Sequence, residues 1–188
     1  MAKSFMLNNV RLSYEHIFTA SAFDDSQPAK YSATVIIPKD HPDLPALKRT
    51  FAEVGKEQFP TAFGGNAWPK GYTCALRDAD TERNQNGELL CEKNPEYAGS
   101  YVLMANSTKR PPVYDRNKAM LTEADGRPYS GCYVNVALGV AGYEYGKIKK
   151  GVKAYLNGIQ FAEHGERFGV DVMNMFSALD GEDNEFMV

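Results

Sequence analysis

Apolar and polar side chains alternate most regularly between residues 129 and 161. In the segment YSGCYVNVALGV, every second position is apolar: Cys132, Val134, Val136, Leu138 and Val140. A spacing of two is typical of the buried side of a half-exposed strand. The segment KKGVKAYLNGIQF repeats the pattern, with Val152, Ala154 and Leu156 in one row. The alternation therefore predicts two strands, joined through AGYEYGKIK.

The second row changes sides near its end. Gly158 interrupts it, after which Ile159 and Phe161 occupy the apolar positions. A glycine at such a change indicates a bulge or a sharp bend, as a small barrel requires.

Three further strands are predicted, at residues 5–14, 30–38 and 100–107, with a short one near 72–77. In the first, Met6, Val10 and Leu12 lie partly on one side of the alternation. In the second, one side carries Tyr31, Ala33, Val35 and Ile37. Residues 15–29 are expected to form an irregular loop.

A helix is predicted from about Asp43, ending before Pro60. Its apolar residues recur at spacings of three and four and should face the core: Leu44, Leu47, Phe51 and Val54. Residues 61–99 are rich in glycine, proline and polar residues. Apart from the short strand, we expect loops there, with the segment DADTERNQNGE in a mobile loop or at a hairpin tip.

Length and composition favour one mainly β domain. The chain of 188 residues is long enough for a substantial core, and 16 glycines and 10 prolines indicate many turns. The first residues, MAKSFMLNN, do not resemble a secretory signal, and no run of 18 apolar residues predicts a membrane span. Three cysteines without metal-ligand spacing favour a reducing compartment.

The net charge of −3 is unevenly distributed. Four acids lie among the last nine residues, DGEDNEFMV, and without them 20 acidic side chains balance 21 basic ones. The body of the chain is therefore nearly neutral, which leaves room for local basic surfaces that bind nucleic acid.

The polar side of the two strands predicts a binding surface. It carries Tyr133, Asn135, Lys153, Tyr155 and Asn157. Tyrosines stack on bases and lysines neutralise phosphates, so the combination suits a single strand of nucleic acid. Outward tyrosines also simply cover sheets, and this alternative stays open.

The densest basic and aromatic cluster follows the strand at 100–107. It comprises Lys109, Arg110, Tyr114, Arg116 and Lys118, around a stiff Pro111–Pro112 pair. We interpret this loop as a clamp on the nucleic-acid backbone, assisted by Lys147, Lys149 and Lys150 in the strand connection. Trp68, Lys70 and Tyr72 form a weaker second candidate patch.

Candidate catalytic groups are sparse. Asp78 and Asp80 could bind a metal ion, as in a nuclease, but no third acid accompanies them at a predictable strand end. The three histidines lie outside known nucleophile patterns, and no phosphate-binding glycine motif is present. We therefore predict a protein that is not an enzyme and that needs no cofactor or metal.

The acidic tail is expected to be disordered. Its acids surround one aromatic residue: Asp180, Glu182, Asp183, Glu185 and Phe186. Such a tail could bind a partner protein, compete weakly with nucleic acid for the basic face, or only increase solubility.

Several segments, in this order, resemble phage single-stranded-DNA-binding proteins. They are NNVRLSYEHIF, KYSATVIIPKDHP, ANSTKRPPVYDRN, YSGCYVNVALGV and GVKAYLNGIQF. The resemblance spans about residues 8–168 and implies an OB-fold-like five-stranded barrel with an inserted helix and long loops. By motif, Lys109, Arg110 and Arg116 match the family's basic loop, and Tyr133 and Tyr155 lie in its hairpin strands.

The resulting prediction is a sequence-independent ssDNA-binding protein that coats and protects ssDNA in phage replication or recombination. Residues 1–176 would form the OB-like domain and residues 177–188 the disordered tail, which contacts replication or recombination proteins. The protein would act in the cytoplasm of the infected bacterial host without a membrane partner, and self-association stays open. The alternative is a non-catalytic virion or assembly protein that uses the barrel surface for protein contacts.

Overall fold

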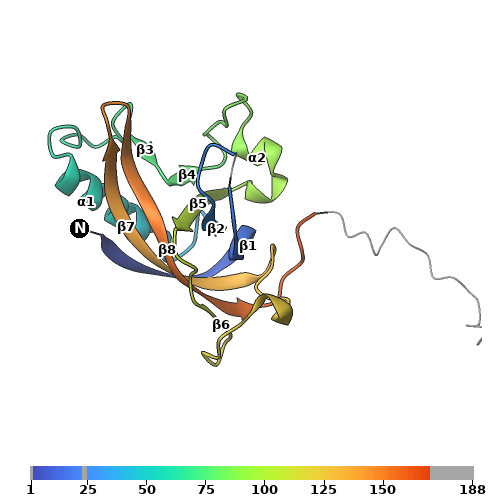
Figure 1. Ribbon diagram of the computed structural model, residues 1–188. Coiled ribbons are helices and arrows are strands. Elements are labelled where there is room, and N and C mark those ends of the chain that lie inside the picture. Colours follow the sequence, from blue (N-terminus) through green and yellow to red (C-terminus); the bar gives the residue numbers. More distant parts are fainter. Residues whose placement is uncertain (1, 23–24, 170–188) are drawn as a thin grey trace, which may run out of the picture.

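Five long strands pair edge to edge until the last meets the first (Figure 1). The computed structural model describes residues 2–22 and 25–169. The barrel strands are β1 (Lys3–Ser21), β2 (Lys30–Pro38), β5 (Ser100–Ser107), β8 (Lys149–Glu163) and β7 (Tyr133–Tyr145), in that spatial order. All neighbours are antiparallel except β5 and β8, whose parallel pairing closes the barrel. The predicted five-stranded, mainly β fold is confirmed.

One long helix and several short elements lie outside the five barrel strands. They are α1 (Leu44–Gln58), β3 (Thr73–Cys74), β4 (Leu76–Asp78), α2 (Leu90–Lys93), η1 (Pro95–Tyr97), β6 (Val113–Tyr114) and η2 (Glu123–Asp125). Strands β3 and β6 pair in parallel with β8, and β4 pairs with β5. The short strand predicted near residues 72–77 corresponds to β3 and β4, whereas the expectation of loops in the rest of 61–99 is wrong for α2 and η1. Elements this short depend on long-range packing more than on local sequence pattern.

The predicted apolar rows form the core. Cys132, Val134 and Val140 are fully buried, and Val136 and Leu138 are 1% exposed. In β8 the buried row changes sides as expected, because Ala137 lies opposite Gly158 whereas Leu138 lies opposite Leu156. Asn157 is the additional residue, so the predicted bulge is confirmed.

The first strand differs from the prediction in register and length. Leu7 pairs with Val136 and Val10 with Val134, so the intervening asparagines form a bulge, with Asn9 at a φ of 51°. This bulge places Leu7 in the core and leaves Met6 55% exposed, which corrects the predicted row of Met6, Val10 and Leu12.

β1 also continues to Ser21, through part of the predicted loop at 15–29. Its second half pairs with β2, for example His16 with Ser32. These cross-strand hydrogen bonds stabilise an extended segment whose own alternation is weak.

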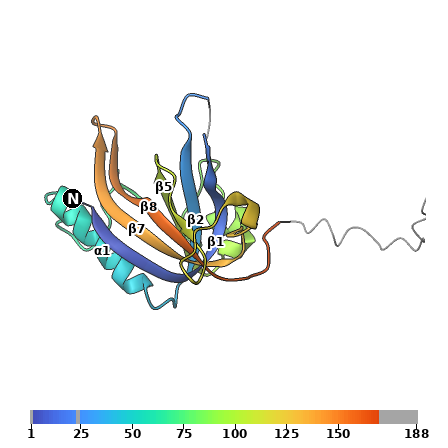
Figure 2. The ribbon, with the colours of Figure 1, turned by 60° about the horizontal axis from the view of Figure 1, so that its bottom comes forward.

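Helix α1 packs against the barrel through the predicted stripe, since Leu44, Leu47, Phe51 and Val54 are buried. In Figure 2 the helix runs beside β7 and the start of β1. A Cβ on Gly142 of β7 would lie 2.7 Å from Cγ of Gln58, the last helical residue. One face of the β7–β8 hairpin is thereby turned toward α1.

The β7–β8 hairpin is longer than predicted. Its strands end at Tyr145 and begin again at Lys149, so the connection comprises residues 146–148 instead of 141–149. Figure 2 shows this hairpin and the β1–β2 hairpin as two arms on either side of β5. Residues 164–169 follow β8 without regular structure. The expected domain boundary at 176/177 and the acidic tail lie outside the described residues.

Candidate nucleic-acid interface

The outward faces of β7 and β8 carry a continuous row of polar and small residues. On β8, Lys153, Tyr155 and Asn157 alternate with the buried positions. On β7 the corresponding outward positions include Gly139. A Cβ there would lie 3.2 Å from the Asn157 amide nitrogen and 3.7 Å from Tyr155 Cβ. The predicted sharing of one face by Tyr155 and Asn157 is therefore observed, with both side chains resting against a glycine.

Three tyrosine rings surround Lys153. Its Nζ lies 4.8 Å from the ring centroid of Tyr155, 5.2 Å from Tyr143 and 5.3 Å from Tyr145. It also donates a hydrogen bond of 3.2 Å to the Tyr145 hydroxyl. We call these four residues the tyrosine cluster. A cation held against exposed aromatic faces is an arrangement that suits stacked bases with adjacent phosphates.

The charge on Lys153 is supported by its neighbours. Partial burial acts to lower the pKa of this ammonium, but hydrogen bonding with Tyr155 and Tyr145 outweighs that effect and raises the pKa above its usual value. The side chain is therefore cationic at neutral pH. The two tyrosines that form these hydrogen bonds remain accessible to solvent, because Tyr145 is 63% and Tyr155 36% exposed.

The same face continues onto β5. Asn106 lies beside Tyr155 in the parallel β5–β8 pairing. Met104, two residues earlier, is 56% exposed on this side. An exposed thioether beside the tyrosine cluster adds an adaptable apolar contact for a flat ring.

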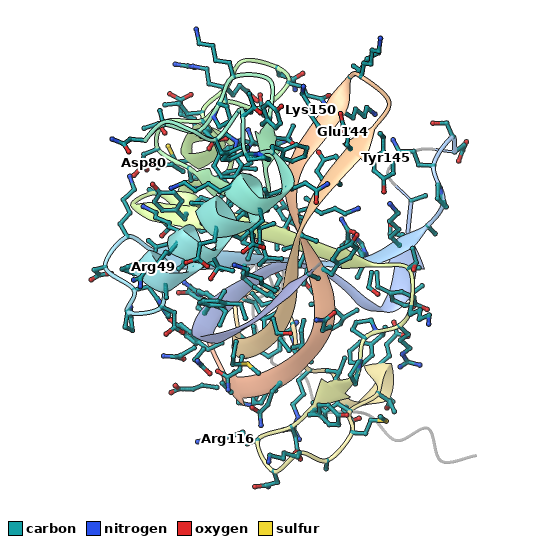
Figure 3. The ribbon with its side chains drawn as sticks, turned by 90° about the vertical axis from the view of Figure 1, so that its left-hand side faces the viewer. Arg49, Asp80, Arg116, Glu144, Tyr145 and Lys150 are labelled. Atoms are coloured by element: carbon teal, nitrogen blue, oxygen red, sulfur yellow. The ribbon has the colours of Figure 1, made fainter. Side chains whose placement is uncertain are left out.

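The predicted basic loop is divided into two groups. Lys109 and Arg110 directly follow β5, where the Arg110 guanidinium lies 5.7 Å from the Phe18 ring centroid of β1. Arg116 and Lys118 instead lie beyond β6, in a turn that Asp115 holds through hydrogen bonds from Asn117 N and Ala119 N. Figure 3 shows Arg116 at the far end of the molecule from Tyr145. The pairing of β6 with β8 separates what the sequence places together.

Asn135 belongs to a chain of amides below the tyrosine cluster. It accepts a hydrogen bond from Asn9 N at 2.8 Å and donates one to Gln160 Oε1 at 3.1 Å. Tyr114 and Lys118 lie next to it, around a cavity that Asn157 also lines. Four predicted site residues therefore meet at this second location.

Tyr133 and Lys150 do not join the tyrosine cluster. Tyr133 lies six positions before Gly139, about 20 Å along the strand at 3.3–3.4 Å per residue. The Arg11 guanidinium lies 5.8 Å from its ring centroid. Lys150 has the opposite orientation to Lys153 along β8 and lies 4.5 Å from the Tyr72 ring centroid, on the α1 side of the hairpin.

The two aromatic residues of the second candidate patch, Trp68 and Tyr72, pack against other residues of the fold. Trp68 donates a 2.7 Å hydrogen bond to the Tyr72 carbonyl oxygen, and its ring packs edge-on against Phe63 at 4.8 Å. Tyr72 contacts both Phe59 and Phe63. These rings contact each other, whereas Lys70 is exposed.

Sequence reasoning missed Tyr143, Tyr145, Met104 and Phe18. The two tyrosines were assigned to the strand connection, although they continue the outward row of Ala137 and Gly139 at a spacing of two. That periodicity was the available signal. No local pattern indicates Met104 or Phe18, because their positions near the face depend on strand pairing.

The two candidate metal-binding carboxylates are engaged by a lysine. Lys39 Nζ lies 3.1 Å from Asp78 and 2.6 Å from Asp80. Asp80 also accepts a hydrogen bond from Gly99 N, and the pKa of its carboxyl is lowered, chiefly by Lys39. Within residues 2–22 and 25–169, no group of three or more His, Cys, Asp or Glu side chains is placed to bind a metal ion.

Comparison with known proteins identifies the family. Residues 3–187 match the family described as Enterobacter phage Enc34, ssDNA-binding protein. The chain belongs to this family. The predicted membership of a phage ssDNA-binding protein family is therefore confirmed. The protein p50 of Acyrthosiphon pisum secondary endosymbiont phage 1 is 34% identical to the present chain over 188 residues, and the match covers 95% of each chain.

Solved structures share the fold of this Enc34-family member. The ssDNA-binding protein of bacteriophage Enc34, in complex with ssDNA, matches with a TM-score of 0.72 and 24% identity, over 88% of this chain and 89% of the other. The ssDNA-binding protein gp2.5 of bacteriophage T7 matches with a TM-score of 0.61 and 13% identity over the full length of both chains. At these identities the likeness concerns the fold. In the described part of the chain, no helix is long and apolar enough to cross a membrane.

Proposed function

We propose that this Enc34-family member coats ssDNA without sequence preference, along the outer face of β8 and its neighbours. The tyrosine cluster carries the proposal, because Tyr145 and Tyr155 are exposed around the cation of Lys153. Bases stack on the rings while Lys153 neutralises a phosphate. None of these contacts reads a base edge, so binding tolerates any sequence.

The strand continues from the tyrosine cluster toward the end of β5. Asn106 and Met104 lie next along the face, and Arg110 follows β5. Arg110 contacts Phe18 from the β1–β2 arm, so it can hold a phosphate between the two arms. This path uses only part of the predicted basic loop.

Membership of the family supports a proposal for the biological role. The protein protects ssDNA and keeps it unpaired during phage replication or recombination, in the cytoplasm of the infected host, and it performs no catalysis. The acidic tail, with its single aromatic residue Phe186, recruits partner proteins. Lys39 supports the non-catalytic assignment by pairing with both candidate carboxylates, Asp78 and Asp80.

Fluorescence-anisotropy titration of labelled oligo-dT with the full-length protein tests this function. We expect tight binding that weakens steeply between low and high salt and that duplex DNA does not displace. A virion or assembly protein would show no binding even at low salt, and that result would overturn the proposal. Degradation of the oligonucleotide with added divalent metal would contradict the non-catalytic role.

A further inference from the structure

A cavity of about 450 Å³ opens on the outer face of β7 and β8, beyond the tyrosine cluster. Its volume lies within the range of small-molecule sites. Its apolar wall includes Met6, Pro112, Ala137 and Ile159. Met6 is 55% exposed because the β1 bulge turns it out of the core. Its side chain lines this cavity instead.

The polar side of the cavity is rigidly built. Asn135 and Gln160 are joined by a 3.1 Å hydrogen bond, and Gln160 Nε2 donates to the Asp115 carbonyl oxygen at 3.2 Å. This link fastens the turn after β6 to the barrel. This turn holds Lys118 at a φ of 66°, at the edge of the cavity. Two backbone amides, of Asn117 and Ala119, donate to the Asp115 carboxylate and stabilise that conformation.

Several polar groups at the cavity are available to a ligand. The Tyr114 hydroxyl, the Lys118 ammonium and the Asn157 amide have no hydrogen-bond or ion-pair partner among residues 2–22 and 25–169. Apolar side chains, an aromatic ring and the unpaired Asn157 amide match the faces and edges of a nucleobase. The ammonium at the edge matches the adjoining phosphate.

The cavity is continuous with the proposed DNA path. Asn157 lines it and lies two residues after Tyr155 on the same side of β8. A Cβ on Gly139 would lie 3.2 Å from the Asn157 amide nitrogen and 3.7 Å from Tyr155 Cβ, so both side chains flank the same glycine. A strand that leaves Tyr155 along β8 therefore reaches the cavity next.

We propose that this cavity holds one nucleobase of the bound strand, turned out of the stacked row, with its phosphate at Lys118. The inference rests on the proposed ssDNA binding and adds a distinct subsite to it. The tyrosine cluster accepts bases by stacking alone, whereas this subsite encloses a single base.

An abasic scan tests the subsite. The probe is the shortest labelled oligo-dT that reaches full affinity, with an abasic site placed at each position in turn. For the unmodified protein, we expect one position toward an end to lose roughly 5- to 150-fold in affinity, the range for losing one base contact. Ala137 lines the cavity, so the larger ring of Ala137→Phe should fill it. This variant should bind the intact probe with an affinity lower by the same factor, and the abasic site at that position should not lower the affinity further.

Asn157→Ala supplies a second variant, and Lys56→Ala on α1 a control that should match the unmodified protein. Circular dichroism checks the fold of each. If the unmodified protein binds oligo-dT but Ala137→Phe and the unmodified protein give the same abasic profile, the subsite is refuted and the proposed function survives. If oligo-dT does not bind at all, the proposed function itself fails.

Discussion

The two faces of the β7–β8 hairpin carry the same pair of residue types in different surroundings. On the outer face, Lys153 lies against tyrosine rings that are open to solvent, including Tyr145. On the α1 face, Lys150 Nζ lies 4.5 Å from the ring centroid of Tyr72. The centroid of that ring lies 4.9 Å from the centroid of Phe59 and 5.5 Å from that of Phe63. A lysine above a tyrosine therefore does not by itself define a binding site.

The difference lies in what the rings already contact. On the α1 side, Tyr72 meets Phe59 and Phe63 edge-on, whereas Phe59 and Phe63 stack on each other. The faces and edges of these rings are therefore used to stabilise the fold. In the tyrosine cluster, the rings of Tyr143 and Tyr145 are tilted at 42° with centroids 5.6 Å apart. The hydrogen bond between Tyr143 and Thr73 involves only the hydroxyl of the tyrosine and leaves its ring faces open. Open ring faces beside a cation are what a base and its phosphate require.

The largest expected effect is on stability, from the packed side. Phe63 is 5% exposed, and its ring fills the space that a side chain on Gly55 would need. Replacing Phe63 with Ala should lower the free energy of unfolding by about 3–5 kcal/mol, because it removes a buried ring and leaves a cavity.

Urea denaturation measures this change. The folded variant should still bind oligo-dT with unaltered affinity, since Phe63 lies on the α1 side. A loss of affinity at temperatures where the variant is folded would break the distinction between the two faces.

The outer face should respond in the opposite way. Tyr145→Ala combined with Tyr155→Ala should weaken ssDNA binding by about 1–3 kcal/mol per base that no longer stacks. Because both rings are exposed, the unfolding midpoint in urea should change little. Anisotropy titration of oligo-dT measures the affinity, and an unchanged value in a folded double variant would refute the stacking assignment.

The smallest effect separates the two lysines. Lys153→Ala should reduce the slope of log affinity against log salt by about 0.7, the value for losing one phosphate contact with a single strand. Lys150→Ala is the matched control, because it removes the same charge from the other face of the same strand and should leave the slope unchanged. Equal effects from both variants would show that only the net charge of the hairpin matters.

Much of the barrel was predictable from local patterns. The strands at 30–38 and 100–107 begin and end where expected. The helix stripe from Leu44 to Val54 is buried, and the bulge lies next to Gly158, at Asn157. These features depend on the spacing of apolar residues within one element, and that spacing is set by the geometry of the strand or helix itself.

The candidate site was only partly predictable. Alternation placed Lys153, Tyr155 and Asn157 on the outer face, and it would have placed Tyr143 and Tyr145 there too had the strands been extended. It could not show that Tyr133 lies far from this group, because alternation defines a side of each strand but not the register that pairs Tyr155 with Gly139.

The sequence by itself therefore determined the family, most of the long elements and the buried rows of α1, β7 and β8, since each depends on residues close together or on an ordered set of segments. Tertiary structure alone decided that β6 divides the basic loop, that the bulge before Val10 turns Met6 outward, and that Met104 and Phe18 lie along the same path. The physical reason is that strand pairing and register join residues distant in the chain, and no local period encodes which edges meet.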